Sequence, residues 1–419
     1  MEQEYNYGPA QPVVTPDEPK RKKAGFGAGL LCGLLIMALV CGAAFGVYYR
    51  ITSQKRFGEL THESVANEAV NRKMEEIQSL LDNYYYLNEV TTEDLEIGIY
   101  NGMIEATGDK YADYYTYEEL LDMLQSTEGV YYGIGATVQL DATGYVRIAG
   151  TIKDSPAEAA GLRENDIIYQ ADGQDLYGYS LEEAVALIRG EEGTSVELGI
   201  IRDGEDLSFT IVRAKVENPT VTYEMQDDAI GYIRISEFDD VTVGQFQEAL
   251  SSIRSQGAKG LIIDLRSNPG GLLSAVVSIA QEILPKGLIV YTENKAGERE
   301  EYTCDGTKEL DIPLVVLVNG NSASASEILS GAIKDYGIGT LVGTTTYGKG
   351  IVQQVMSLSD NTAVKITVSA YYTPNGNNIH GTGIAPDVEI EMDTDAYYDE
   401  GVDNQLEKGL EVLREKMKQ

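Results

Sequence analysis

The sequence has few of the residues that most enzymes use for imidazole, thiol or metal chemistry. It contains two histidines, three cysteines and no tryptophan among 419 residues. It has no His-Glu-x-x-His motif and no spaced cysteine pairs, so we expect neither a metal ion nor a cofactor. Cys304 is the one cysteine outside the apolar segment 24–49 and therefore cannot form a disulfide within the rest of the chain. It also lacks the helix or histidine context of a nucleophile.

Basic residues are scarce as well. The chain has 32 lysines and arginines against 67 aspartates and glutamates, which gives a formal net charge of −35. A nucleic-acid-binding protein needs a basic face, so this balance excludes a nucleic-acid partner and indicates a solvated acidic surface.

Residues 24–49 are a long stretch without charge. As a helix, these 26 residues would extend roughly 39 Å, more than the ~30 Å of a bilayer core and longer than the ~7–15 residues of a signal-peptide core. Four basic residues at 20–23 precede this stretch and should stay on the cytoplasmic side of the membrane. We therefore expect a disordered cytoplasmic tail (1–23), one transmembrane helix (24–49) that anchors the protein in the cell membrane, and the remaining domains outside the cytoplasm.

The remaining chain divides into four regions by pattern. Residues 60–127 show amphipathic helical spacing, which predicts an arm for packing or for a homodimer. Short strands and turns occupy 129–215, and strands alternate with helices over 220–395. Apolar residues recur at helical spacing over 396–419, so we expect a C-terminal helix there.

Region 129–215 contains well-marked turns. Ser155 and Pro156 begin a short helix that Gly161 ends, and Ser180 begins a second helix. This order of elements resembles a PDZ domain. The resemblance implies that a peptide C-terminus adds as a strand beside the second helix. It also implies that a glycine-rich loop binds the peptide carboxylate, and the corresponding residues here are Tyr132, Gly133, Ile134 and Gly135.

Region 220–395 predicts a parallel sheet that is buried on both faces. The strand at 260–266 leads into an Asn-Pro-Gly-Gly loop, and the strand at 313–318 leads into a turn with Ser322, Ser324 and Ser326. Loops at the carboxyl ends of such strands carry the sites of α/β folds, so the two loops should converge. A serine at a strand-to-helix turn is exposed and has backbone N–H groups beside it.

A serine nucleophile needs a base, and neither His62 nor His380 lies in a catalytic pattern. Lys349 lies between Gly348 and Gly350, which would let it enter a pocket. Its pKa, ordinarily about 10.4, falls when burial removes water. Gln353 could then hydrogen-bond the amine, although in a straight strand the two residues would stand ~13 Å apart.

Four stretches together resemble the carboxy-terminal processing, or tail-specific, serine peptidases: "SASASE", "GKG", "DLRxNPGG" and "GTGIAPD". The resemblance implies an α/β crotonase-like peptidase core with an inserted, mostly-β PDZ domain. It also implies that Ser324, the middle serine, is the nucleophile, that Lys349 is the base and that Gln353 is its partner. The implied oxyanion donors are the amides of Ala325 and of either Gly270 or Gly271.

The predicted fold is therefore this core and PDZ domain, preceded by a helical N-terminal arm and a single transmembrane helix. The predicted function is a membrane-anchored serine endopeptidase with a Ser–Lys dyad that cleaves exported proteins near their C-termini. The PDZ domain would bind substrate tails and gate activity. Two alternatives remain: a non-catalytic PDZ scaffold at the membrane, against which the intact Ser324 and Lys349 argue, and a crotonase-type acyl enzyme, against which the PDZ insertion argues.

Overall fold

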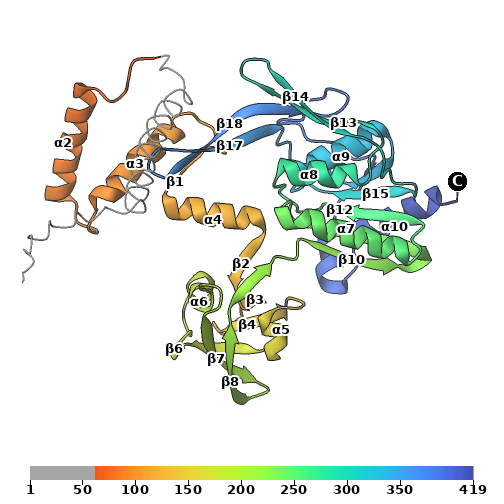
Figure 1. Cartoon of the computed structure of the whole chain (residues 1–419), viewed down its shortest axis with the longest axis horizontal. Coiled ribbons are helices and arrows are strands. Elements are labelled where there is room, and N and C mark those ends of the chain that lie inside the picture. Colours follow the sequence, from red (N-terminus) through yellow and green to blue (C-terminus); the bar gives the residue numbers. More distant parts are fainter. Residues whose placement is uncertain (1–61, 419) are drawn as a thin grey trace, which may run out of the picture. The chain divides into compact units, whose positions relative to one another are not determined.

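A computed structural model describes residues 62–418 (Figure 1). The chain divides into two compact units, with the boundary between Val90 and Thr91. The described part of the first unit contains helix α2 (Glu68–Tyr84), which begins after Asn67 because the side chain of Asn67 accepts hydrogen bonds from two amides of the first turn. None of the residues of α2 is buried.

One part of the predicted fold is corrected by the structure. Within residues 62–418, no helix is both long enough and apolar enough to cross a membrane. Helix α2, for example, has 17 residues and carries acidic and basic side chains, whereas a spanning helix needs about 20 mostly apolar residues. The predicted tail (1–23) and the predicted span (24–49) lie outside the described residues.

The second unit begins with two helices that flank a short strand. They are α3 (Thr92–Glu105), β1 (Asp113–Tyr115) and α4 (Tyr117–Glu128). Reciprocal side-chain and backbone hydrogen bonds cap both helices, from Thr91 to Asp94 and from Thr116 to Glu119. Helix α4 ends at Gly129, whose left-handed backbone (φ 71°) turns the chain out of the helix.

A six-stranded sheet forms the centre of the peptidase-like region. In spatial order its strands are β10 (Val221–Gln226), β11 (Ile230–Ile235), β12 (Gly260–Asp264), β15 (Leu314–Val318), β16 (Gly339–Gly343) and β19 (Val388–Glu389). All neighbours pair in parallel except β10 and β11, which are antiparallel. The expected parallel sheet is thus present, with one antiparallel strand at its edge.

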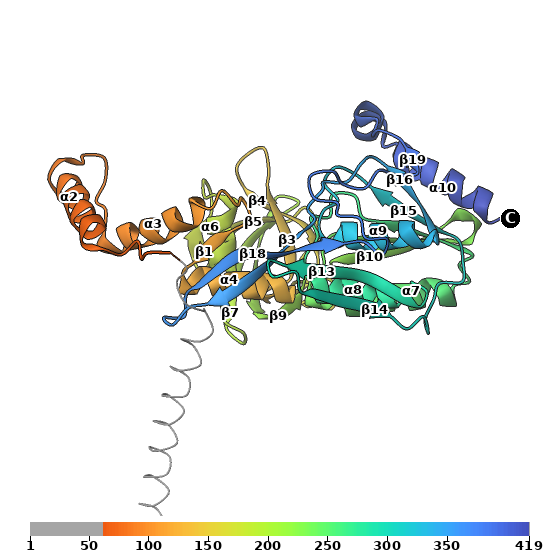
Figure 2. The same ribbon diagram turned by 90° about the horizontal axis from the view of Figure 1, so that it is seen from above.

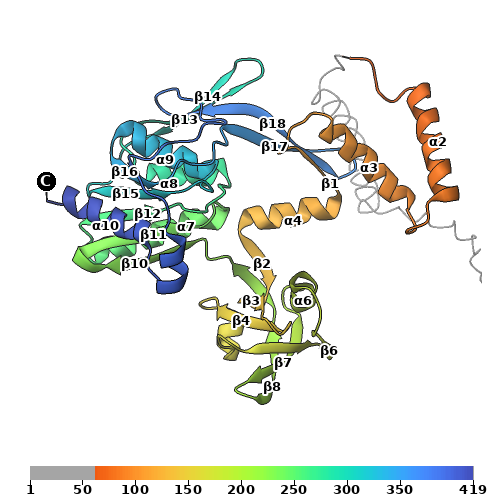
Figure 3. The same cartoon turned by 180° about the vertical axis from the view of Figure 1, so that it is seen from behind.

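Helices cover both faces of this sheet. Figure 1 shows α7 (Asp240–Ser255) and α8 (Leu273–Gln281) in front of it, and Figure 3 shows α10 (Asn404–Lys416) on the opposite face. Leu261 and Ile263 pack into the core shared with α7, α8 and α9 (Ala325–Tyr336), whereas Ile262 packs with Leu413 of α10. Alternate residues of one strand therefore enter two different cores, which is why the strands read as continuous apolar runs.

A second, antiparallel sheet joins segments far apart in the sequence (Figures 1 and 2). It contains β1 together with β13 (Gly287–Asn294), β14 (Arg299–Cys304), β17 (Ile351–Ser357) and β18 (Ala363–Tyr372). Asp113 of β1 lies opposite Lys365 of β18. This pairing holds the residues just before β1 beside the segment that contains Lys349.

The PDZ-like region is entered and left through a two-stranded ribbon of β2 (Val130–Gly133) and β9 (Ala214–Glu217). Its sheet has the order β3-β4-β5-β7-β8, with β6 on β5. The strands are β3 (Ala136–Leu140), β4 (Val146–Thr151), β5 (Ile167–Ala171), β6 (Gln174–Asp175), β7 (Ser195–Arg202) and β8 (Glu205–Val212). Two helices, α5 (Pro156–Ala160) and α6 (Leu181–Ile188), begin after Ser155 and Ser180 as the capping signals predict.

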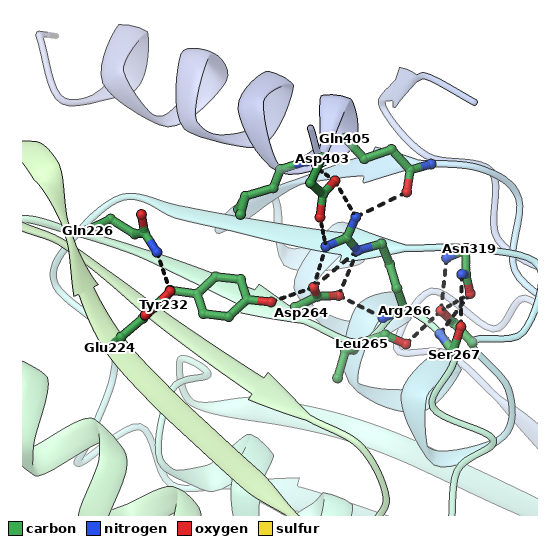
Figure 4. Close-up of polar contacts among 12 residues, drawn as sticks. Glu224, Gln226, Tyr232, Asp264, Leu265, Arg266, Ser267, Asn319, Asp403 and Gln405 are labelled. Atoms are coloured by element: carbon green, nitrogen blue, oxygen red, sulfur yellow. Dashed lines mark hydrogen bonds and ion pairs between the residues drawn. The ribbon is translucent and has the colours of Figure 1, made fainter. Parts of the chain in front are cut away.

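The loop after β12 is held by a buried arginine (Figure 4). The guanidinium of Arg266 binds Asp264 at the end of β12 and Asp403 directly before α10, with distances of 2.6 and 2.8 Å from Nη2 to the carboxylate oxygens. Gln405 of α10 accepts a further bond from the same group. These contacts link the C-terminal helix to the loop that leads to Gly270 and Gly271.

Candidate active site

Ser324 lies at the turn between β15 and α9. Its backbone has φ 51° and ψ −112°, a conformation that residues other than glycine rarely adopt. The turn is fixed from both sides, because the Ser324 amide donates to Glu327 Oε2 at 2.9 Å and its carbonyl accepts from the Tyr371 hydroxyl at 3.1 Å. The sharp turn places the residue after a buried strand and directly before a helix, where the positive end of the helix dipole lies.

The three serines of this turn have different surroundings. The hydroxyl of Ser322 donates to the Leu265 carbonyl at 2.8 Å, and that of Ser326 donates to the Asn268 carbonyl at 3.1 Å. Both of these serines are fully buried. Ser324, in contrast, lines a cavity of about 550 Å³. Two of the serines therefore hold the turn in place, and the third is open to a ligand.

The Asn-Pro-Gly-Gly loop packs directly against this turn. A methyl group on Gly270 would lie 2.8 Å from Cβ of Ser324 and 3.0 Å from the amide nitrogen of Ala325, so only glycine fits. The Gly270 amide donates to Asn268 Oδ1 at 2.8 Å and is therefore already used. Among the described hydrogen bonds outside regular helices and strands, none uses the amide of Gly271 or of Ala325 as donor.

Glu327 connects the serine turn to the lysine segment. Its carboxylate is fully buried and accepts four hydrogen bonds. Oε1 accepts from the Thr346 hydroxyl and the Gly348 amide, while Oε2 accepts from the amides of Ser324 and Lys349. One buried side chain thus fixes the backbones of both predicted catalytic residues. Glu327 was not predicted from the sequence, because an acidic residue three positions after a serine also occurs in ordinary helix caps.

The side chain of Lys349 is half-buried and lines the same cavity as Ser324. Burial lowers the pKa of its amine, and the nearby positive charge of Lys365 lowers it further. Tyr347 and Asp109 act in the opposite direction but do not outweigh these effects. The amine lies 4.7 Å from the ring centroid of Tyr111. The described hydrogen bonds do not join the Lys349 amine to the Ser324 hydroxyl, and such contacts are often long without substrate.

Gln353 also lines the cavity, but its hydrogen bond differs from the expected one. Its amide nitrogen donates to the Thr367 hydroxyl at 3.1 Å rather than binding Lys349. The strand that carries it, β17, begins at Ile351, and its register shifts between Val352 and Gln353. The straight-strand geometry assumed from the sequence does not apply, because this irregularity lies between the two residues.

The rest of the cavity wall is mostly apolar but also includes two acidic residues, Glu237 and Asp239. Leu272, Leu273, Ile328, Ile351, Val352 and Tyr371 contribute to it, together with residues of α4. Gly271 and Ala325 line it, but Gly270 does not, within the described chain. Cys304, His62 and His380 are likewise not among the described lining residues. A hydroxyl, an amine and two backbone amides in a mainly apolar cavity are the groups that acyl transfer from a peptide requires.

The PDZ-like region has a separate groove of about 270 Å³ between β3 and α6. Of the predicted peptide-binding residues, Ile134 lines this groove. Tyr132 and Gly133 belong to β2 and pair with Lys215 and Ala214 in the ribbon. Gly135 has φ +80°, and its carbonyl accepts from the Ser155 hydroxyl at 3.0 Å. Tyr131 and Arg189, which the sequence analysis did not identify, also line the groove.

Comparison with known proteins agrees with both regions. The profile of Peptidase family S41 matches residues 229–390, and that of the PDZ domain matches residues 147–202. The carboxyl-terminal-processing protease of Synechocystis sp. is 40% identical over 282 residues, which are 66% of this chain and 66% of that protein. The carboxy-terminal processing protease CtpA of Bacillus subtilis is 36% identical over 327 residues, covering 78% of this chain and 69% of that protein.

A solved structure shows the same fold. A Bacteroides fragilis protein described as an S41 protease aligns with a TM-score of 0.50 at 17% identity, over 75% of this chain and 90% of that one. The chain spans about two thirds of the length of the curated relatives it matches, from 65% to 71% for the first three. On these similarities, the chain belongs to the carboxy-terminal processing proteases of peptidase family S41.

Proposed function

We propose that the protein is a serine endopeptidase in which Ser324 is the nucleophile and Lys349 is the general base. The observation that carries this proposal is that both side chains line one cavity while the carboxylate of Glu327 holds both backbones. The lowered pKa of Lys349 supports the assignment, because a base must be uncharged to accept a proton. The distinct roles of Ser322 and Ser326 in the core support the choice of Ser324.

In the proposed mechanism, the Lys349 amine takes the proton of the Ser324 hydroxyl as Oγ bonds to the substrate carbonyl carbon. The amides of Ala325 and Gly271 stabilise the oxyanion; we choose Gly271 because the Gly270 amide already binds Asn268. The Lys349 ammonium then protonates the leaving amine as the C–N bond breaks, which leaves an ester on Ser324. Lys349 next takes a proton from water as the water oxygen attacks the ester carbonyl carbon, and it gives that proton to Ser324 Oγ as the ester C–O bond breaks, which releases the acid and restores the serine.

The proposed substrates are proteins cleaved near their C-termini, with the PDZ groove binding the tail. The PDZ match and the mainly apolar groove beside β3 support this proposal. A tail peptide should bind the intact protein, and Val185→Glu in the groove wall should weaken binding and shift the cleavage rate. Glu182→Gln on α6, outside the described groove lining, is the matched control. Equal affinity in both variants would contradict the PDZ role.

The catalytic assignment is tested with three single variants and an unfolded reporter protein. Ser324→Ala and Lys349→Ala should each abolish cleavage, whereas Ser322→Ala should retain it with lower thermal stability. An acyl-enzyme trapped on the peptide that contains Ser324, detected by mass spectrometry, would identify the nucleophile directly. Full cleavage by Lys349→Ala at neutral pH would contradict the proposal.

Two further expectations from the sequence stay predictions. A homodimer would cover apolar side chains such as Ile77 and Leu80, which are exposed on α2. Sedimentation of the protein and of Ile77→Ser would test this. A location of the catalytic domains outside the cytoplasm would be tested by the accessibility of the protein to an added protease in intact cells.

A further inference from the structure

The loop between α3 and β1 lies next to the proposed base. The amine of Lys349 is 4.7 Å from the ring centroid of Tyr111, and that of Lys110 is 4.9 Å from the same ring. Lys110 also donates to the Tyr347 hydroxyl at 2.7 Å. Lys110 and Lys349, which are far from each other in sequence, therefore both lie close to the ring of Tyr111.

The position of Tyr111 is fixed by its neighbours. Its amide donates to the Asp109 carboxylate at 3.0 Å, and a hydrogen bond between Thr367 of β18 and that same carboxylate lowers the pKa of Asp109. The β1–β18 pairing begins two residues after Tyr111, where Asp113 lies opposite Lys365. The ring is thus held against the lysine by backbone pairing and by a side-chain bridge.

We infer that Tyr111 is a positioning residue of the peptidase, whose ring covers the Lys349 amine, keeps water from it and so favours its uncharged form. This inference rests on the proposed function, in which Lys349 is the base. Within the described chain, the cavity lining does not include Tyr111. The ring can therefore act on the amine without contacting substrate.

Some groups around the Lys349 amine lower its pKa and others raise it. Burial is the largest influence on Lys349 and lowers its pKa. Lys365 of β18 and Lys110 lower it too, whereas Tyr347 and Asp109 raise it. An aromatic ring attracts an ammonium group, which opposes the effect of burial. The positive charge of Lys110 near the same ring disfavours a second cation there, and we assign the larger effect of Tyr111 to its exclusion of water from the amine.

Removal of the ring should therefore hydrate the amine and raise its pKa. A rise of about one in the pKa of a base lowers its uncharged fraction at neutral pH about tenfold. For Tyr111→Ala we expect kcat at pH 7 to fall about tenfold, KM to change less than twofold, and activity to recover as pH rises. Tyr111→Phe keeps the ring and should match the wild-type profile. Tyr223→Ala, which removes an exposed tyrosine of β10, is the control for the loss of a tyrosine side chain.

The decisive measurement is the pH profile of kcat for the full chain and these variants. An acid limb displaced to higher pH in Tyr111→Ala, with Tyr111→Phe unchanged, supports the inference. A loss of kcat that is equal at every pH indicates a merely structural role and overturns it, as does an unchanged profile. If Tyr111→Ala fails to fold, Tyr111→Leu replaces it and should show a smaller displacement in the same direction, because leucine excludes water only in part.

A second readout does not depend on turnover. In proteins that also carry Ser324→Ala, the pH midpoint of Lys349 acylation by a small anhydride is measured by peptide mass spectrometry. The midpoint should rise in Tyr111→Ala, and an unmoved midpoint overturns the inference. Lys349→Ala separates the two hypotheses. If it retains cleavage, the proposed function fails; if it is inactive while Tyr111→Ala behaves as wild type, only this inference fails.

Discussion

Oε2 of Glu327 accepts a hydrogen bond from the backbone amide of Lys349 at 2.8 Å, although the two residues are 22 positions apart in the chain. The same oxygen accepts the Ser324 amide at 2.9 Å. The spacing between the backbones of Ser324 and Lys349, the proposed nucleophile and base, is therefore set through one buried atom. A side chain that accepts fewer hydrogen bonds would leave amides unpaired on one or both sides.

Glu327→Gln should lower kcat by about 10- to 100-fold, because small displacements of catalytic groups have large effects on rate. One of the two terminal atoms of glutamine can only donate, so at least one backbone amide loses its acceptor. Kinetics and chemical denaturation measure the result. Glu282→Gln is the control, since Glu282 is a buried carboxylate bound to Lys308 at 2.6 Å and is not among the described cavity residues. The control should lose stability but keep kcat, and equal kcat in both variants would refute the role of Glu327.

Thr367→Val should release the Gln353 amide, whose nitrogen donates to the Thr367 hydroxyl at 3.1 Å. Valine preserves the volume but cannot accept this bond, and it also removes the hydrogen bond from Thr367 to the Asp109 carboxylate. We therefore expect kcat to fall about fivefold through loss of orientation of Gln353 and of the loop that carries Tyr111. Thr362→Val removes an exposed hydroxyl that binds Asp360 beside the same sheet, and it should leave kcat unchanged. Steady-state kinetics compares the two. A similar response of both variants would mean that Gln353 does not need this partner.

Asp239 makes stability depend on pH. Burial, followed by the charges of Glu237 and Asp240, raises the pKa of its carboxyl to about 7. The folded protein therefore keeps this proton where the unfolded chain, with a pKa near 3.8, has lost it. The proton bound to Asp239 stabilises the folded protein fully at pH values below the pKa of the unfolded chain. This stabilisation is lost as the pH rises through the pKa of the folded protein. Asp239→Asn should thus stabilise the protein at pH 8 by roughly 1–3 kcal/mol and have little effect at pH 4.

Urea denaturation at both pH values tests this prediction. Asp240→Asn is the comparison, because it removes a neighbouring charge but leaves the buried carboxyl, so its gain at pH 8 should be smaller. An equal gain for Asp239→Asn at pH 4 and pH 8 would exclude titration as the cause.

Gly129 and Gly108 form a matched pair for substitution. Both have left-handed backbones, with φ values of 71° and 70°. A methyl group on Gly129 would lie 2.6 Å from Val241 and 2.8 Å from Cβ of Asp239, whereas Gly108 has open space around it. We expect Gly108→Ala to cost about 1 kcal/mol of stability from backbone strain and Gly129→Ala about 2–3 kcal/mol from strain and overlap. If the two variants lose equal free energy of unfolding, α7 moves enough to accommodate the methyl group added at position 129.

The local parts of this fold were predictable because their signals are short in sequence. The turn from Ser155 to Gly161 gave the limits of α5, and the apolar run before Ser322 gave a buried parallel strand. The antiparallel sheet was not predictable, since β1 and β18 are about 250 residues apart and nothing local marks their register. The transmembrane helix was the incorrect part of the fold prediction, as described above.

The candidate site was predictable to a similar extent. Motifs near Ser324 and Lys349 mark residues that line one cavity, because each motif contains the glycines or serines that its turn requires. Glu327 and Tyr111 were missed for different reasons. Glu327 reads as an ordinary helix cap, and Tyr111 reaches the lysine through strand pairing that the sequence does not reveal. The partner of Gln353 was missed because the strand irregularity before it is also invisible in sequence.

The buried arginine after β12 has a consequence for autolysis. Arg266 shares its guanidinium between Asp264 and Asp403. The loop that contains Gly270 and Gly271 is therefore supported by a segment that follows, in sequence, all the described residues that line the cavity. A cut in the stretch before Asp403 would leave those lining residues intact, but the loop would then depend on α10 remaining packed against the sheet through side chains such as Leu413.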